Sequence, residues 1–163
     1  MTPRAAMLAD IPALLALWNP VIRDTAITFN SAQKTHDALV QMLADKARTG
    51  HGFLVAMDGP QLLGFASYGQ FRAGIGYAHS MEHTIILADG ARGRGVGRAL
   101  MAAIEGHARA GGAASIYAGV SAENPAGRAF HAALGYAELA TLPRVGFKFG
   151  RWMDLHLMHK FLT

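Results

Sequence analysis

Apolar residues recur along this chain with two different periods, and each period predicts one kind of element. Recurrence every three to four residues predicts a helix, and it occurs at about 10–18, 35–48, 96–110 and 124–134. Asp10 and Asn124 stand where a helix cap is favourable, and each has a proline in the turn that follows. Gly50 stands where the second helix would end. The pattern therefore predicts helices at these places.

Short apolar runs bounded by turn residues predict the strands. "FLVAM", "DGPQ" and "LLGFASY" have the pattern of a strand, a turn and a strand, and a longer strand covers about Gly76 to Leu87. "SIYAGV", "YAELATL" and "WMDLHLMHKFL" complete the set, with "PRVGFKFGR" as a loop between the last two. "NPVIRDTAITF", after the first helix, is also expected to be a loop. This order predicts a single α/β domain over residues 1–163, with a mixed central sheet flanked by helices.

Composition narrows the class of protein. Hydrophobic residues make up 52% and charged residues 16%, which argues against disorder. No apolar run reaches the roughly 18 residues that a membrane span needs. The absence of cysteine excludes disulfides and a thiol nucleophile, and together with an N-terminus unlike a signal peptide it favours a cytoplasmic location. A net charge of +4, without a broad basic face, favours no nucleic-acid partner.

Histidine, a common metal ligand, is frequent in the chain, with eight residues. His79 and His83 lie close together on an expected strand, as do His156 and His159. No cluster of carboxylates accompanies either pair, as a metal centre in such a chain would require. We therefore expect no metal.

The segment "RGRGVGRAL" lies between an apolar strand and a helix and predicts an anion site. Backbone N–H groups at a helix start have no partner within the helix, and the helix dipole favours an anion there. Glycines allow a phosphate to approach the main chain closely, and arginines add charge. The expected pyrophosphate site consists of Arg92, Gly93, Arg94, Gly95, Val96, Gly97 and Arg98.

Two familiar phosphate motifs do not match this segment. A Walker A loop requires Lys followed by Ser or Thr after its last glycine, which is absent here. A dinucleotide fingerprint requires an acidic residue about 20 positions on, where this chain has Tyr117. A glycine-rich turn on a basic surface, without a ligand, is the remaining alternative.

"RGRGVGRAL", with Arg92, Gly95 and Gly97 in the matching places, resembles the acetyl-CoA signature of the GCN5-related N-acetyltransferase (GNAT) family. "ENPAGRAFHAALGY" is similar to the second element of that family, at the usual separation. "LWNPVIRDTAITFN", "MEHTIIL" and "GFKFGRWMDL" further resemble the branch of phosphinothricin and methionine sulfoximine acetyltransferases. The resemblance implies a sheet with a splayed strand pair that holds acetyl-CoA, and transfer to the α-amino group of small amino-acid analogues.

Residue roles follow from the resemblance. Glu82, ten residues before Arg92, is implied as the base that takes a proton from the amine, and its apolar neighbours would raise its pKa. A strand glutamate facing solvent is the plain alternative. The backbone of Ile85, Ile86 and Leu87 would bind the acetyl carbonyl and pantetheine, with the N–H of Ile86 or a neighbour as donor, where a bulge separates two strands. These residues can also be ordinary core.

Two further residues are implied on the fourth helix. His131 occupies the position where the wider family often has a tyrosine that assists the departing thiolate, and the phosphinothricin branch also has His there. Asn124 would bind pantetheine. The alternatives are a structural histidine and a simple helix cap.

The substrate side is less closely matched. Arg72 is a candidate for binding a substrate carboxylate, and aromatic residues near it would form the pocket wall. The expected substrate-binding residues are Phe29, Phe71, Arg72, Tyr77, Met81, Glu82 and His83. Aromatic residues at such places are also typical of a core, and Lys148 and Arg151 are either part of the pocket or ordinary surface charge.

The sequence thus predicts an N-acetyltransferase that joins acetyl-CoA and an amine in a ternary complex, because no cysteine is available to form an acyl-enzyme. The resemblance also implies a homodimer. A family member acting on another amine, such as an aminoglycoside, a polyamine or a protein N-terminus, is the first alternative. A non-catalytic acyl-CoA-binding module is the second.

Overall fold

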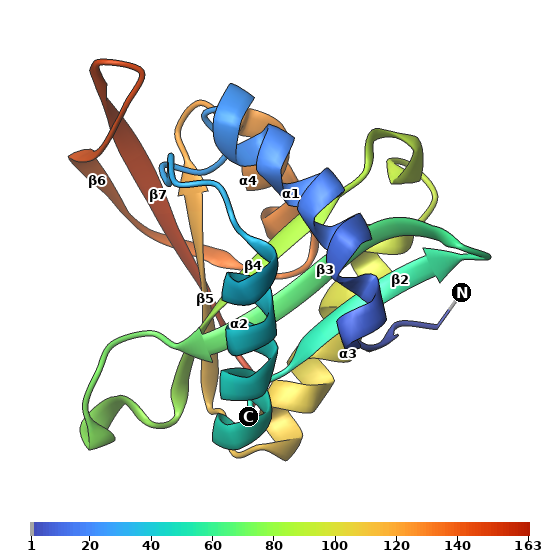
Figure 1. Ribbon diagram of the computed structural model, residues 1–163. Coiled ribbons are helices and arrows are strands. Elements are labelled where there is room, and N and C mark those ends of the chain that lie inside the picture. Colours follow the sequence, from blue (N-terminus) through green and yellow to red (C-terminus); the bar gives the residue numbers. More distant parts are fainter. Residues whose placement is uncertain (1) are drawn as a thin grey trace.

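A seven-stranded mixed sheet forms the centre of the computed structural model, which describes residues 2–163 (Figure 1). The spatial order of the strands is β1-β2-β3-β4-β5-β7-β6, and only β4 and β5 run parallel. The strands are β1 (Arg4–Ala5), β2 (Phe53–Asp58), β3 (Gln61–Gln70), β4 (Ser80–Leu87), β5 (Ser115–Ser121), β6 (Ala137–Lys148) and β7 (Arg151–Phe161). The expected α/β architecture with a mixed sheet is confirmed.

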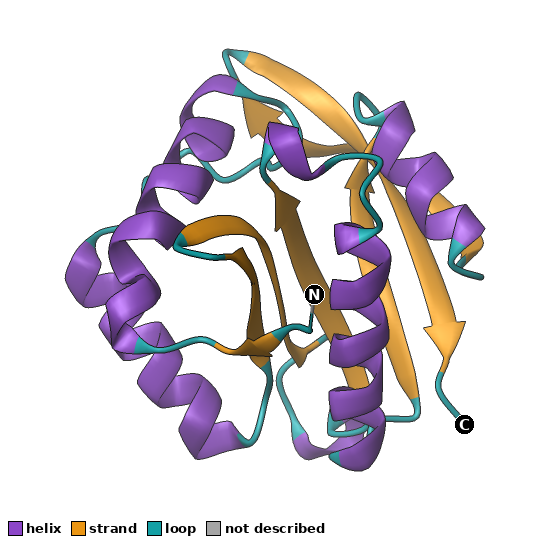
Figure 2. Cartoon of the chain, turned by 90° about the vertical axis from the view of Figure 1, so that its right-hand side faces the viewer, coloured by secondary structure: helices purple, strands orange, loops and turns teal. Residues whose placement is uncertain are grey.

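Helices cover both faces of this sheet, as Figures 1 and 2 show. They are α1 (Ile11–Asp24), α2 (His36–Thr49), α3 (Val96–Ala110) and α4 (Pro125–Ala133). One apolar core joins α1 and α2 to the sheet and includes Trp18, Phe65 and Ile86. The other joins α3 to the opposite face and includes Leu100 and Ile116. All the expected helices are therefore present, one pair on each face.

The first helix is longer than the sequence pattern predicted. It continues through Pro20 to Asp24, where a loop was expected. A proline inside a helix removes one hydrogen bond and costs about 3 kcal/mol. Ile22, two residues further on, is only 1% exposed, and its burial against the sheet offsets that cost. The loop prediction for residues 19–24 was therefore wrong.

Strand boundaries differ from the prediction in three places. β4 begins at Ser80, because residues 75–77 form a single 3₁₀ turn, and the short β1 was not foreseen. β6 and β7 extend through most of the expected loop at 143–151 and meet at Phe149 and Gly150, both with positive φ. The register of β6 shifts between Leu142 and Gly146, so the proline there accompanies a bulge and does not end the strand.

The parallel pair β4 and β5 separates soon after it begins. Their Cα pairing covers only Ser80 to Glu82 on β4, whereas β5 continues beside β7 to Ser121. The edge of β4 that faces β5 is therefore unpaired from residue 83 onward. The expected splayed strand pair is present. The expected bulge is not, because β4 keeps an unshifted register against β3 from Met81 to Leu87.

Candidate active site

A cavity of about 1630 Å³ opens where β4 and β5 separate. It extends between α1 and α2 on one face of β4 and the start of α3 with α4 on the other. Single small-molecule pockets usually measure about 300–1,000 Å³, so this one has room for two ligands. Of the sequence-based candidates, the structure brings these to its wall: Phe29, Glu82, His83, Ile85, Ile86, Leu87, Arg92, Gly93, Gly95, Val96, Gly97, Arg98, Asn124 and His131.

The start of α3 forms an anion cradle at one end of the cavity. Gly95 caps the helix in the left-handed region, with φ 77°, and no side chain bonds to the helix start. Gly93 has φ 72°. A Cβ on either glycine would meet nothing within 4 Å, so glycine is required there by the backbone conformation. The N–H groups of Val96 to Arg98 therefore have no partner within the helix and can bind an anion.

The arginines of this segment take different positions. Arg92 and Arg98 line the cavity, and Arg92 makes only a long contact of 3.8 Å with Asp89. Arg94 instead binds Asp58 at 2.9 Å, and it does not line the cavity. The chain thus offers two arginine side chains and a row of backbone donors to an anion, while the third arginine connects this turn to β2.

The backbone of β4 supplies further donors where the strands separate. Phe71 N donates to Ser80 O and Ala88 N donates to Leu63 O, each at 2.9 Å. In an antiparallel pair with unshifted register, alternate residues face the partner, so the even-numbered residues of β4, Ile86 among them, bond to β3. The N–H groups of Ile85 and Leu87 consequently point to the open side. The available donors are the neighbours of Ile86.

Glu82 lies at the point of separation, opposite Tyr117 of β5 and Gly69 of β3. Its side chain reaches the cavity and makes no hydrogen bond or ion pair with any residue from 2 to 163. The surrounding protein nevertheless removes enough water to raise the pKa of the Glu82 carboxyl. A carboxylate that is unpaired, accessible and of raised pKa is suited to accept a proton.

His83 and His131 form a buried pair on the other face of β4. Their Nε2 atoms lie 3.2 Å apart, and the rings stack with centroids 5.0 Å apart. His131 Nδ1 lies 2.7 Å from the carbonyl oxygen of Gly127, which can only accept, so Nδ1 carries a proton. In the neutral pair His83 Nε2 then donates to His131 Nε2. His83 Nδ1 remains buried without a partner among residues 2–163.

Burial keeps both rings uncharged near neutral pH. Desolvation, with a smaller contribution from His131, lowers the pKa of His83 to about 3. Desolvation also lowers the pKa of His131, although the Gly127 carbonyl and Glu105 oppose it. Side chains alternate across a strand, so Glu82 and this pair lie on opposite faces of β4. Glu82 and the histidine pair nevertheless both line the cavity. A ligand passing between β4 and β5 would therefore contact both.

Asn124 combines its two expected roles. Its Oδ1 accepts a hydrogen bond from Gly127 N at 2.9 Å, which makes it the cap of α4. It also lines the cavity, and its amide nitrogen is left to bind a ligand.

Phe29 forms part of the cavity wall and is held from the far end of the chain. Its ring lies directly against Gly146 of β6, where any side chain would collide with it. Lys148 is only 4% exposed, and its Nζ donates to Thr25 O at 2.6 Å and Thr28 O at 2.8 Å. Lys148 is therefore neither surface charge nor part of the cavity wall. It fixes the segment that carries Phe29.

The remaining substrate candidates lie outside the cavity wall. Phe71 stacks on Tyr117 with centroids 4.4 Å apart, and Met81 is buried in the core beside α3. Arg72 lies over the ring of Tyr77, 5.6 Å from its centroid, in the exposed connection between β3 and β4. The structure does not bring these side chains to the cavity.

Sequence reasoning missed Lys46 of α2 and Ser67 of β3, which line the cavity on the same side as Glu82. Strand register could have found Ser67, because it pairs with Thr84 on the face that carries Glu82. Nothing in the helical pattern distinguished Lys46. Its position depends on how α2 crosses the sheet.

Two other findings concern what residues 2–163 contain. Within this range no three His, Cys, Asp or Glu side chains are grouped so that they could hold a metal ion. None of the helices described there is both long and apolar enough to cross a membrane.

Comparison with known proteins identifies relatives whose sequences align with nearly the whole chain. The family model described as Acetyltransferase (GNAT) family matches residues 18–136. An L-methionine sulfoximine/L-methionine sulfone acetyltransferase of Pseudomonas aeruginosa is 35% identical over 156 residues, covering 95% of this chain and 91% of that protein.

Solved structures give the same result. A ribosomal-protein-alanine N-acetyltransferase of Brucella melitensis has TM-score 0.94 and 40% identity, covering 99% of both chains. A phosphinothricin acetyltransferase of Sinorhizobium meliloti in complex with acetyl-CoA has TM-score 0.92 and 27% identity, covering 98% of this chain and 87% of that one. From the family match, and from the splayed strands and anion cradle described above, it follows that this chain belongs to the acetyltransferase (GNAT) family.

Proposed function

We propose that this protein transfers the acetyl group of acetyl-CoA to the α-amino group of a small amino-acid analogue of the methionine sulfoximine, methionine sulfone or phosphinothricin type. One observation carries the proposal: an unpaired Glu82 carboxylate stands where β4 and β5 separate, beside free backbone donors and within one cavity that ends at a helix start. The curated relative from Pseudomonas aeruginosa supports the substrate class.

The residues present fit acetyl-CoA. The helix start at Val96, with Arg92 and Arg98, suits a pyrophosphate, because it offers free N–H groups and positive charge. The unpaired edge of β4 and the amide of Asn124 suit the amide groups of pantetheine. When bound there, acetyl-CoA supplies the activated acetyl group.

Glu82 acts as the general base in this proposal. An ammonium group has no free electron pair, so the amine must lose a proton before it can attack, and Glu82 accepts that proton directly or through a water molecule. The N–H of Ile85, the nearer one to Glu82, donates a hydrogen bond to the acetyl oxygen as it gains negative charge, and the N–H of Leu87, two residues along the strand, is left for pantetheine. Transfer is direct, within a ternary complex, because the chain has no cysteine to carry an acyl group.

His131 acts by hydrogen bonding at the thiol end of the same cavity. Burial lowers its pKa more than the hydrogen bond from Nδ1 to Gly127 O raises it, so His131 is neutral at pH 7. A neutral imidazole can stabilise a departing thiolate only through a hydrogen bond or a relayed proton. In the neutral pair the only N–H of His131 bonds to Gly127 O and its Nε2 accepts from His83, so we propose that His131 shares its Nδ1–H with the departing thiolate, while His83 fixes the orientation of the ring.

A protein N-terminus is the second candidate substrate, and the similarity to the ribosomal-protein-alanine N-acetyltransferase of Brucella melitensis favours it. Such a substrate would present its N-terminal amine to Glu82, as a free amino acid would. A free amino acid and a short peptide with the same first residue distinguish the two candidates. A much higher rate with the peptide would favour the protein N-terminus.

We also propose that residues 1–163 act as one domain in the cytoplasm and that the chain forms a homodimer. The β6–β7 hairpin at the edge of the sheet supports the dimer. It exposes a group of large apolar side chains, which are Leu139, Val145, Phe147, Phe149 and Trp152. Exposed apolar groups of this size mark an interaction surface, and a second copy is the commonest partner in a symmetric oligomer.

The experiment that tests the function is a thiol-release assay with acetyl-CoA. We expect thiol release with phosphinothricin, methionine sulfoximine or methionine sulfone, and an N-acetylated product by mass spectrometry. Aminoglycosides, polyamines and a short peptide serve as competing acceptors. Thiol release with one of these, and none with the amino-acid analogues, would contradict the proposed substrate class. Stabilisation by acetyl-CoA without turnover on any acceptor would indicate a binding module.

A further inference from the structure

Lys46 places an ammonium group in the cavity without a carboxylate to neutralise it. The residue lies in the last third of α2, and its Nζ donates a hydrogen bond to the carbonyl oxygen of Tyr68 on β3. An ammonium has three donor hydrogens, so two remain available. Desolvation lowers the pKa of Lys46, and no acidic residue contributes to its pKa. A partly buried cation without an anionic partner is a ready site for an anion.

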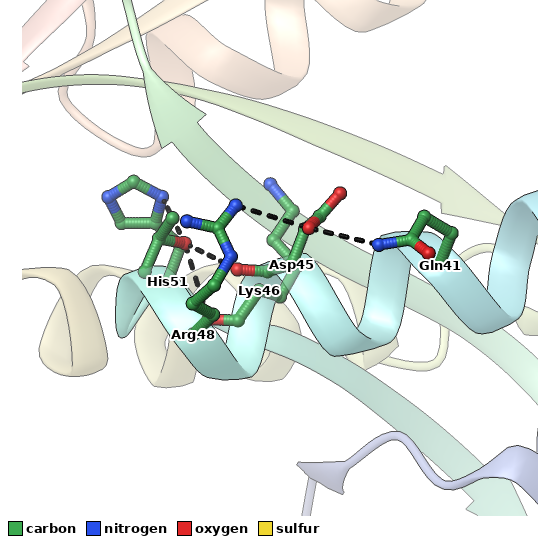
Figure 3. A network of polar contacts seen from close by, with 6 residues as sticks. Gln41, Asp45, Lys46, Arg48 and His51 are labelled. Atoms are coloured by element: carbon green, nitrogen blue, oxygen red, sulfur yellow. Dashed lines mark hydrogen bonds and ion pairs between the residues drawn. The ribbon is translucent and has the colours of Figure 1, made fainter.

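The nearest carboxylate in sequence is already occupied. Asp45 Oδ1 accepts hydrogen bonds from Arg48 at 3.1 Å and from Gln41 at 3.2 Å, as Figure 3 shows. Thr49 contacts His51 Nδ1 at 3.1 Å at the same end of α2. In Figure 3 the side chain of Lys46 extends away from this network. No ion pair among residues 2–163 includes it, so the helix leaves its ammonium free for a ligand.

Lys46 and Glu82 face the same part of the cavity. A Cβ on Gly69 would lie 3.2 Å from Lys46 Nζ, and Gly69 pairs directly with Glu82 across β3 and β4. Residues paired in this way have Cα atoms about 5.5 Å apart and carry side chains on one face of the sheet. Neither group contributes to the pKa of the other, so they do not form a close ion pair. A cation and an anion are thus held near each other with space between them.

An α-amino acid has an amine and a carboxylate on one carbon atom, which matches this arrangement. We propose that Lys46 binds the α-carboxylate of an amino-acid substrate while the amine faces Glu82. This inference rests on the proposed function and adds the residue that selects amino acids over simple amines. Arg72, the carboxylate partner expected from the sequence, lies over Tyr77 outside the cavity wall. The other lysine at the wall, Lys34, lies over the ring of Trp18 at 5.0 Å.

The test compares two substrates that differ only in the carboxylate. These are methionine sulfone and its decarboxylated form, 3-(methylsulfonyl)propylamine. In Lys46→Met we expect the KM for methionine sulfone to rise about 10- to 100-fold, the loss typical of a hydrogen bond to a charged group. The kcat should change little, and the KM for the amine should stay as in the unsubstituted protein. Lys46→Arg should recover most of the affinity for methionine sulfone.

Two variants serve as matched controls. Lys34→Met removes the same charge from the same cavity, and Arg72→Met removes the alternative carboxylate partner. Both should leave the ratio of the two KM values unchanged. A selective loss in Arg72→Met and not in Lys46→Met would overturn the proposal, and so would an equal loss on both substrates in Lys46→Met. Acetyl-CoA affinity by calorimetry, unchanged in every variant, verifies that each one is folded.

The outcome for the unsubstituted protein separates this inference from the function on which it rests. If that protein acetylates simple amines but no amino-acid analogue, the proposed substrate class is wrong, and the role of Lys46 is overturned with it. If it acetylates methionine sulfone and Lys46→Met does so with the same KM, only the role of Lys46 is wrong.

Discussion

At the scale of single residues, the buried pair of His83 and His131 is the feature with the clearest physical consequence. One proton lies between the two Nε2 atoms, and the Gly127 carbonyl decides which ring supplies it. His83 Nδ1 is left without a hydrogen bond in the core, which is costly for a buried polar atom. We expect a residue that lowers stability in this way to serve function. We infer that His83 orients His131 beside the cavity.

The pair makes stability depend on pH. Both folded-state pKa values lie below those of an unfolded chain, so the unfolded state binds more protons and the free energy of unfolding falls as pH decreases from about 6.5 toward 5. The slope is at most about 1.4 kcal/mol per pH unit for each histidine. In His83→Gln we expect a smaller slope, measured by urea unfolding at several pH values. His36→Gln, at an exposed position, should keep the full slope, and an equal slope in all three proteins would contradict this account.

At the scale of elements, function depends on how β4 leaves β5 and how α3 begins. The first feature opens a row of N–H groups on Ile85 and Leu87, and the second presents those of Val96 to Arg98. Neither feature is a side chain. Both depend on backbone conformation, which a substitution can disturb only through the dihedral angles or the hydrogen bonds.

Gly95 allows this idea to be tested at the helix start. Its φ of 77° is unfavourable for a residue with a Cβ by about 1–2 kcal/mol, and a β-branched residue is worse. We expect Gly95→Val to weaken acetyl-CoA binding at least tenfold by calorimetry, with a small decrease in melting temperature. Gly90→Ala is the matched control, because Gly90 lies in the same turn with open space around it and without a positive φ. Unchanged affinity in Gly95→Val would remove the cradle from the binding site.

The sequence predicted these elements because their signals are local. A glycine-rich turn before an amphipathic helix identifies the cradle, and the spacing from Arg92 identifies Glu82 as a candidate. Features that depend on packing were not predicted. Residues 19–24 were expected to be a loop, and Lys148 to be surface charge or pocket wall, because the burial that decides each case comes from distant segments. Lys46 was missed for the same reason.

At the scale of the whole molecule, one edge of the sheet exposes large apolar side chains. β6 is the last strand, and Phe147 of β6 packs on Trp152 of β7 with centroids 5.0 Å apart while both remain exposed. The same hairpin carries Gly146 and Lys148, which hold Phe29 at the cavity wall. A partner on this hairpin would therefore stiffen the wall of the active site, so assembly and activity are expected to be linked.

Sedimentation equilibrium tests the assembly. We expect twice the chain mass for the unsubstituted protein and a single chain mass for the double variant Phe147→Asp and Trp152→Asp, because two buried charges would prevent association. Activity should decrease with the loss of the dimer. Phe161→Asp changes an exposed aromatic residue near the end of β7, away from the hairpin tip, and should remain a dimer. A monomeric unsubstituted protein at micromolar concentration would contradict the proposal.

The most direct test of the central claim is the acetylation rate of Glu82→Gln at saturating acetyl-CoA and methionine sulfone. The account predicts that kcat falls about 10²- to 10⁴-fold, as expected when a general base is removed, while the affinity for acetyl-CoA by calorimetry stays the same. Because the pKa of Glu82 is raised, the unsubstituted protein should lose activity as pH decreases through that pKa, and the residual activity of Glu82→Gln should not. Unchanged turnover and an unchanged pH profile in Glu82→Gln would contradict the account.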